Sequence, residues 1–358
     1  MGPHPGSRTV FAAAHVVADP NADNAPGAPA VVDWDATLAF RHHLWSLGLG
    51  IADAMDTAQR GMGLDWAATK ELIQRSGAEA RSVGGLICCG VGTDQLPGAP
   101  TSPYSLAEIG DAYEGQLEVV EQAGAQPVLM CSRALAATAR GAEDYAEVYA
   151  RILGQAERPV ILHWLGDMFD PALKGYWGGS DLDAATESVL EIINEHAAKI
   201  DGIKVSLLDA DREVALRRRL PEGVRLYTGD DFNFPELIAG DEQGFSHALL
   251  GIFDPLATQA AQAMRLLDAG DVAGFRGMLD PLVPLARHIF AAPTQFYKTG
   301  VVFLAYLSGY QDHFKMIGGQ ESGRDRAHLT KLYAMAVEGG IFPDAESAAA
   351  RFKEYAGD

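Results

Sequence analysis

Apolar positions along the chain gather in short continuous runs. Each run is followed by a polar loop and then by a segment with apolar residues near helical spacing. Continuous apolar runs are typical of parallel strands that are covered on both faces, and helical spacing is typical of amphipathic helices. The pattern predicts strands over residues 9–17, 50–55, 85–90, 127–131, 159–164, 202–207, 224–229 and 245–250.

The segments between these runs begin with residues that cap helices. Asp33, Asp65 and Ser105 each precede a helical pattern, and side chains of this kind accept hydrogen bonds from the backbone N–H groups of a first turn. Helices are predicted over residues 33–47, from 65 onward, and over 105–122, 143–153, 183–196, 211–219 and 234–238.

Eight strands, each followed by a helix, predict an α/β fold of the (β/α)8 TIM barrel type, which typically needs about 250 residues. The remaining sequence contains only helical patterns. We therefore predict a barrel over residues 1–255 and a helical C-terminal extension over 256–358 that packs on it. An open, doubly wound sheet is the alternative. In a barrel, the reactive groups are expected at the carboxyl ends of the strands.

The charge and composition of the chain exclude some classes of binding partner. Its formal net charge is −20, so neither nucleic acid nor an anionic membrane is expected to bind it. No apolar run reaches the ~18 residues of a membrane span, and residues 1–8 contain no apolar signal core, which predicts a cytoplasmic protein. Cys88, Cys89 and Cys131 lack the CxxC spacing, which predicts buried, inert thiols and no disulfide framework.

One lysine stands out because it interrupts an apolar run. Lys204 lies within residues 201–209, which otherwise have the pattern of a buried strand. Burying an ammonium is costly unless it is paired, solvated or neutralised. A lysine in such surroundings can attack a carbonyl and form a Schiff base. The other interpretation is a lysine at a strand end whose amine reaches water.

The sequence around Lys204 adds a resemblance. Gly202-Ile203-Lys204 is followed by Tyr227-Thr228-Gly229-Asp230-Asp231, and then by segments at residues 244–249, 290–294 and 298–300. This order resembles the dihydrodipicolinate synthase and N-acetylneuraminate lyase superfamily over about residues 8–310, most closely over 158–305. The resemblance implies a class I aldolase-type barrel with Lys204 as its Schiff-base lysine, a small-molecule carbonyl substrate and no cofactor. It also implies a homo-oligomer, either a dimer or a tetramer.

Two positions depart from the superfamily pattern. Its fifth strand usually ends in a tyrosine that relays protons, whereas this chain has His163, which can do the same work. The turn that holds the carboxylate of a 2-oxo acid is matched by Asp56 and Thr57. Because Asp56 would repel a substrate carboxylate, we predict a lyase, aldolase or dehydratase for a hydroxylated carbonyl compound, such as a keto sugar, in preference to a simple 2-oxo acid.

Other residues are candidates for substrate binding. Asp53 can accept hydrogen bonds from substrate hydroxyl groups together with Asp56. Arg133 could bind an anionic group or pair with a surface carboxylate. Asp230 could contact the substrate or cap a helix. Trp164 and His247 complete the predicted set of substrate contacts.

A metal site is the main alternative to Schiff-base chemistry. Nitrogen and oxygen donors near the predicted strand ends would suit a divalent ion in a sugar isomerase, an epimerase or a metal-dependent aldolase. These candidate ligands are His15, Asp53, Asp56, His163, Asp230 and His247. No compact metal motif such as HExxH is present, so the favoured prediction includes no metal. A binding or regulatory barrel without enzymatic activity is a further possibility.

Overall fold

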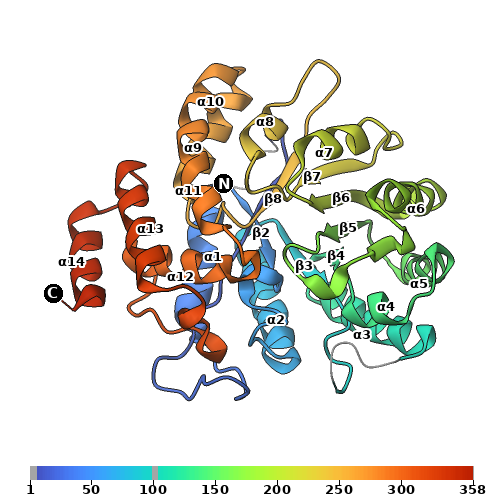
Figure 1. Cartoon of the computed structure of the whole chain (residues 1–358), viewed down its shortest axis with the longest axis horizontal. Helices are drawn as coiled ribbons and strands as arrows, with labels where there is room; N and C mark the ends of the chain where they lie inside the picture. Colours follow the sequence, from blue (N-terminus) through green and yellow to red (C-terminus); the bar gives the residue numbers. More distant parts are fainter. Residues whose placement is uncertain (1–5, 99–103, 358) are drawn as a thin grey trace. The chain divides into compact units, whose positions relative to one another are not determined.

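In the computed structural model, which describes residues 6–98 and 104–357, eight strands form one closed parallel barrel in sequence order (Figure 1). The predicted (β/α)8 barrel is therefore confirmed. The first five residues of the predicted amino-terminal segment lie outside the described residues. The strands are β1 (Val10–Ala13), β2 (Gly50–Asp53), β3 (Ile87–Val91), β4 (Gln126–Leu129), β5 (Val160–Leu165), β6 (Ile200–Ser206), β7 (Arg225–Thr228) and β8 (His247–Leu250).

Helices follow the strands, and their starts agree with the predicted caps. The side chains of Asp33 and Asp65 accept hydrogen bonds from the first turns of α1 and α2, and Ser105 forms a reciprocal capping box with Glu108 at α3. The helices that alternate with the strands are α1 (Trp34–Ser46), α2 (Trp66–Val83), α3 (Leu106–Gln122), α4 (Arg133–Thr138), α5 (Ala142–Gln155), α6 (Leu182–Glu195), α7 (Ala210–Arg217) and α8 (Phe234–Ala239). Sequence reasoning missed the short helix α4.

Every element after β8 in the described part of the chain is helical, as predicted. The α-helices here are α9 (Ala257–Asp268), α10 (Val272–Leu279), α11 (Val283–Ile289), α12 (Tyr297–Leu307), α13 (Arg326–Glu338) and α14 (Ala345–Ala356). Short 3₁₀ helices are η1 (Asp56–Ala58), η2 (Pro171–Leu173), η3 (Tyr176–Gly178), η4 (Ala197–Lys199), η5 (Asp280–Leu282), η6 (Thr294–Phe296) and η7 (Ile317–Gly323). Across residues 6–98 and 104–357, no helix is both long enough and apolar enough to span a membrane.

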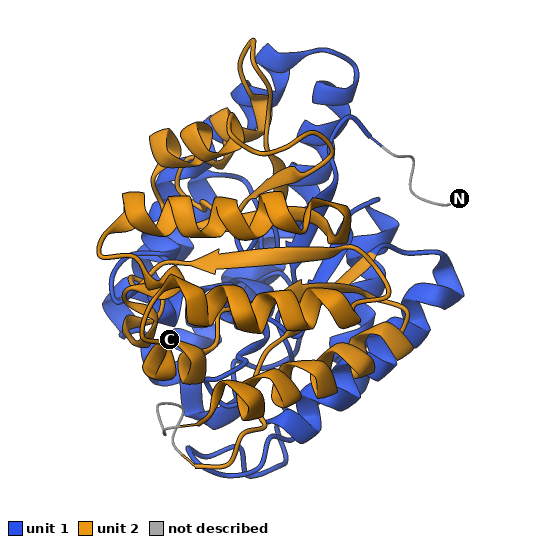
Figure 2. Ribbon diagram, turned by 90° about the vertical axis from the view of Figure 1, so that its right-hand side faces the viewer, with its two compact units in different colours: residues 1–86, 250–358 blue, residues 87–249 orange. Residues whose placement is uncertain are grey.

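Contacts divide the chain into two compact units, coloured separately in Figure 2. Unit 1 contains residues 1–86 and 250–358, and unit 2 contains residues 87–249. Unit 1 thus groups β1 and β2 with the helices that follow β8. The division of the chain at residue 255 that the sequence suggests stays a prediction.

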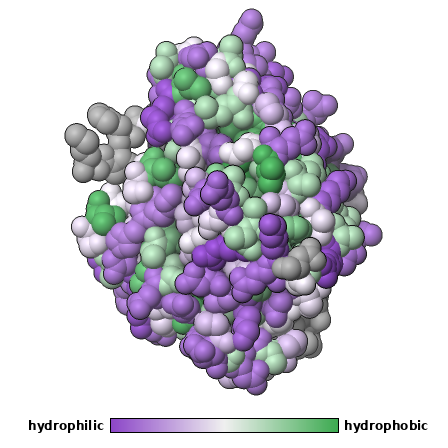
Figure 3. Space-filling view, turned by 90° about the vertical axis from the view of Figure 1, so that its left-hand side faces the viewer, coloured by the Kyte–Doolittle hydropathy of each residue, from purple (hydrophilic) through white to green (hydrophobic). Residues whose placement is uncertain are grey.

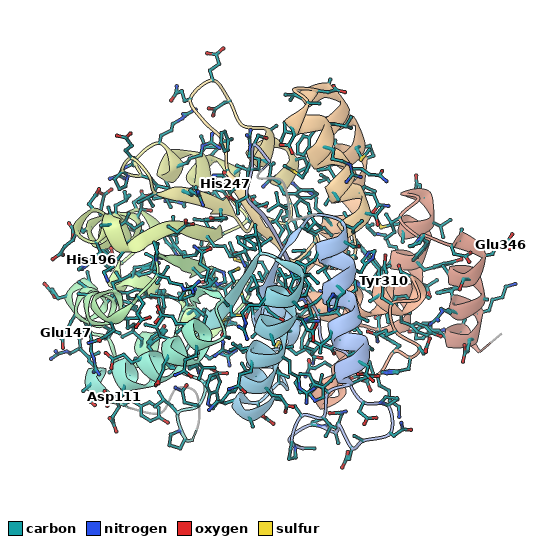
Figure 4. The ribbon with its side chains drawn as sticks, turned by 180° about the vertical axis from the view of Figure 1, so that it is seen from behind. Asp111, Glu147, His196, His247, Tyr310 and Glu346 are labelled. Carbon is teal, nitrogen blue, oxygen red and sulfur yellow. The ribbon has the colours of Figure 1, made fainter. Side chains whose placement is uncertain are left out.

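Apolar residues and thiols are buried in the interior, and acidic residues lie on the surface. All residues of α12 are buried within unit 1, and Cys88 and Cys89 are buried thiols in β3. Acidic residues such as Asp111 and Glu147 point outward from helices of unit 2 (Figure 4). Hydrophilic residues predominate on the face drawn in Figure 3, with apolar residues scattered among them.

Candidate active site

Lys204 and His163 lie side by side on two neighbouring strands of unit 2. Lys204 lies in the carboxyl half of β6, and its register partner on β5 is His163. Register partners in a parallel sheet project from the same face. The exposed fraction of Lys204 is 8%, and that of His163 is 0%. The lysine is therefore a buried residue within a strand.

Gly229 leaves the space that the Lys204 side chain occupies. Its backbone N–H donates a 2.7 Å hydrogen bond to the Val205 carbonyl, which holds it close to β6. A Cβ at this position would lie 2.8 Å from Lys204 Cε and still closer to Ser206 Oγ. Real Cβ atoms almost never approach other atoms so closely. A glycine is therefore required here for both side chains to keep their positions.

The imidazole of His163 has one nitrogen paired and one unpaired. Its Nε2 lies 3.3 Å from Ser206 Oγ, and its buried Nδ1 has no hydrogen-bond partner among the described residues. Burial, with a smaller contribution from the positive charge of Lys204, holds the pKa of His163 well below its ordinary value of 6.5. The ring is therefore neutral at pH 7.

Residues just after β4 form hydrogen bonds that hold the backbone of His163 and the hydroxyl of Tyr176. Cys131 Sγ donates a 3.0 Å hydrogen bond to the His163 carbonyl, and the next residue, Ser132, donates its backbone N–H to the hydroxyl of Tyr176 at 3.0 Å. The hydroxyl of Tyr149 lies 3.1 Å from that of Tyr176. Burial raises the pKa values of both tyrosines well above 10, so these phenols remain neutral.

Sequence reasoning missed Ser206 and the support from Cys131 and Tyr176. Ser206 stands two residues after Lys204 on the same strand, so strand alternation alone would have placed both side chains on one face. The contacts of Cys131 and Tyr176 join segments far apart in the sequence, and no local pattern indicates them.

Trp164 does not lie beside Lys204. It follows His163 on β5 and pairs with Val205, so it projects from the opposite face of the sheet. Its ring meets that of Trp177 edge-on, with 6.4 Å between the ring centroids. Trp164 therefore packs against Trp177 on the face of the sheet opposite to Lys204, and the predicted substrate contact stays a prediction.

Two polar candidates have structural partners. The Asp230 carboxylate accepts hydrogen bonds from the backbone N–H groups of Phe232 and Asn233 at 2.8 and 3.0 Å, so it caps a turn. Arg133 pairs with Asp170 through a 2.5 Å contact between Nε and Oδ2. In both cases the structure shows the structural role that the sequence left open beside the binding role.

His247 lies two strands from Lys204 in the same row of register partners, because Tyr227 of β7 pairs with both residues. It is the first residue of β8 and is labelled in Figure 4. Its ring centroid lies 5.4 Å from that of Tyr227. The Tyr227 hydroxyl in turn donates a 2.6 Å hydrogen bond to Asp201, near the start of β6. His247 is therefore level with Lys204 in strand register, although it begins β8 and Lys204 lies in the carboxyl half of β6. The substrate contact predicted for His247 stays a prediction.

In unit 1, Asp53 is held by an arginine. Arg41 on α1 donates hydrogen bonds to both carboxylate oxygens of Asp53, with Nε–Oδ2 and Nη2–Oδ1 distances of 3.0 and 2.8 Å, and both side chains are fully buried. Breaking such a pair leaves an uncompensated buried charge. Both carboxylate oxygens of Asp53 are thus engaged by Arg41, and its predicted contact with substrate hydroxyl groups stays a prediction.

The other predicted residues of unit 1 lie in or beside η1 and β1. Thr57 Oγ1 lies 2.8 Å from the Tyr297 hydroxyl, and Asp56 begins η1 with a half-buried side chain. His15 pairs through Nδ1 with Asp254 at 2.8 Å. Across residues 6–98 and 104–357, no three His, Cys, Asp or Glu side chains are arranged to hold a metal ion together.

The chain belongs to the family described as "Protein of unknown function (DUF993)", whose model matches residues 2–356. No curated protein matches it.

Solved structures share its fold at low sequence identity. Dihydrodipicolinate synthase from Thermotoga maritima is 13% identical, with 93% of this chain and 100% of that chain covered and a TM-score of 0.67. 4-Hydroxy-tetrahydrodipicolinate synthase from Methylacidiphilum fumariolicum SolV is 16% identical, with coverages of 96% and 98% and a TM-score of 0.67. Dihydrodipicolinate synthase from Oceanobacillus iheyensis is 13% identical, with coverages of 93% and 97% and a TM-score of 0.66. The superfamily resemblance seen in the sequence is confirmed for the fold.

Proposed function

We propose that this member of the DUF993 family is a Schiff-base-forming lyase of the class I aldolase type, with Lys204 as the reactive amine. One observation carries the proposal: Lys204 is buried within β6, directly opposite the buried, neutral imidazole of His163. A buried amine beside a group that accepts protons is the arrangement that amine nucleophiles require.

The proposed chemistry begins with attack of the Lys204 amine on a ketone or aldehyde. Loss of water gives an iminium ion, which draws electrons from the adjacent carbon and permits cleavage or formation of a carbon–carbon bond, or dehydration. His163 takes a proton from the substrate and returns it. General acid–base catalysis of this kind typically contributes about 10²–10⁴-fold to a rate.

For the substrate, we propose a carbonyl compound rich in hydroxyl groups, such as a keto sugar. Arg133, which could have balanced a substrate carboxylate, is already paired with Asp170. Asp56 and Thr57 keep the role that the sequence resemblance implies, which is to position substrate hydroxyl groups. A homo-oligomeric state, dimer or tetramer, is likewise a proposal, and light scattering of the native protein tests it.

The experiment is reductive trapping with borohydride in the presence of keto sugars and 2-oxo acids, followed by peptide mass mapping. We expect an adduct on Lys204 with at least one hydroxylated carbonyl compound, and no adduct in Lys204→Ala. Lys199→Ala is the matched control, because Lys199 is a partly exposed lysine whose amine donates to the Ala156 carbonyl. It should retain the adduct. Absence of any adduct on Lys204 across the panel would contradict the proposal.

A further inference from the structure

Ser206 is a buried hydroxyl next to both members of the proposed site. It follows Lys204 by two residues on β6, so both side chains project from the same face. Its exposed fraction is 2%, and its Oγ lies 3.3 Å from His163 Nε2. The position that a Cβ would take at Gly229 lies within 3 Å of both Ser206 Oγ and Lys204 Cε. The hydroxyl therefore stands beside the lysine side chain and the imidazole.

From this geometry we propose that Ser206 relays protons between Lys204 and His163 while the Schiff base forms. The inference rests on the proposed function and adds a third residue to its site. A serine hydroxyl donates one hydrogen bond and accepts others at the same time. It can therefore pass a proton to one neighbour as it receives one from the other, without carrying a charge of its own.

The step needs such a relay because protons must move from nitrogen to oxygen. A lysine ammonium and a carbonyl compound give an iminium ion and water. The new bond joins Nζ to the carbonyl carbon, and the bond between that carbon and its oxygen breaks. Two protons leave the nitrogen and end on the departing water, so the overall step consumes no further proton. The Ser206 hydroxyl and the neutral His163 ring together supply a path for these transfers.

The pairing also gives the two ring nitrogens of His163 different surroundings. Its Nε2 is engaged by the Ser206 hydroxyl, whereas its Nδ1 has no partner in the described part of the chain. The hydroxyl can donate to Nε2 or accept from it, so it gives Nε2 a partner in either tautomer of the ring. Loss of the hydroxyl would leave both nitrogens buried and unpaired and would alter the balance between the two tautomers.

The test compares Ser206→Ala and Ser206→Cys with the native protein. The rate of borohydride trapping at Lys204 is measured under excess carbonyl compound. We expect Ser206→Ala to slow trapping by about tenfold to a hundredfold, toward the low end of general acid–base effects, and Ser206→Cys to recover part of the rate. Ser76→Ala is the control, because Ser76 is a fully buried serine of α2 whose hydroxyl has no partner among the described residues.

A second measurement does not depend on turnover. Nitrogen NMR of the His163 ring reports which nitrogen carries the proton, and we expect Ser206→Ala to change that distribution while Ser76→Ala leaves it unchanged. A native trapping rate in Ser206→Ala would overturn the relay and leave the Lys204 proposal standing. Absence of an adduct in the native protein would overturn the proposed function and the relay with it.

Discussion

At the scale of single residues, the site depends on the absence of a side chain at Gly229 as much as on the amine of Lys204. The Lys204 methylenes and the Ser206 hydroxyl both occupy space that any side chain at residue 229 would claim. The backbone of Gly229 cannot retreat easily, because its N–H is bonded to the Val205 carbonyl at 2.7 Å. A larger residue would therefore displace the reactive groups before it displaced the strand.

We predict that Gly229→Ala lowers the rate of adduct formation at Lys204 by at least about tenfold. Its cost in the free energy of unfolding should be that of an overpacked interior, about 1–3 kcal/mol. Trapping kinetics and denaturant unfolding measure the two effects. Gly115→Ala is the control, because a Cβ at Gly115 in α3 meets no atom within 4 Å, and alanine favours helix by about 1 kcal/mol. Normal adduct formation in Gly229→Ala would show that Lys204 does not need its present position.

At the scale of elements, a buried acid ties α7 to the two last strands. Glu213 is 1% exposed. Its carboxyl oxygens accept hydrogen bonds from Thr228 at the end of β7, at 3.0 Å, and from Ser246 just before β8, at 2.7 Å. Burial raises the pKa of Glu213 to about 8, although the two hydroxyl donors oppose the shift. The acid is therefore mostly protonated at pH 7 in the folded protein.

This pKa shift predicts how stability depends on pH. In the unfolded chain Glu213 loses its proton near its ordinary pKa of 4.5, whereas in the folded protein it keeps the proton up to about pH 8. The folded state therefore binds more protons between these values, and stability falls as pH rises through this window. We expect Tm to fall more steeply over pH 5–8 in the native protein than in Glu213→Gln. Glu236→Gln, at an exposed position of α8, should follow the native curve. If the curves of Tm against pH for the native protein and Glu213→Gln were parallel, they would contradict the raised pKa of Glu213.

At the scale of the whole molecule, the barrel could be predicted because each strand is an apolar run that a parallel sheet buries on both faces. Helix α4 could not, because its six residues are too few for a periodic pattern. The lysine and its histidine partner could be predicted from their strands, but the pairing of Asp53 with Arg41 depends on a tertiary contact between α1 and β2. The face that Trp164 takes could not be predicted, because an apolar run does not by itself show the face of each residue.

The net charge of −20 is the other property that belongs to the molecule as a whole. Like charges repel one another and destabilise a compact state. This repulsion extends over ~30 Å at 0.01 M salt but only ~10 Å at 0.1 M. Salt also weakens exposed ion pairs such as Arg219–Glu187 and Arg75–Glu71, but each exposed pair contributes only about 0–1 kcal/mol. The net effect of moderate salt should therefore be stabilising.

We predict that raising NaCl from 10 to 150 mM increases Tm by about 2 °C or more, the shift that ~1 kcal/mol produces in a large domain. Scanning calorimetry at fixed pH measures it. KCl should act equally, because screening does not depend on the identity of the cation, whereas sucrose at the same osmolarity should have a smaller effect. A fall in Tm with salt would mean that the exposed ion pairs outweigh the repulsion among the excess acidic groups. A response to one cation alone would instead indicate specific binding.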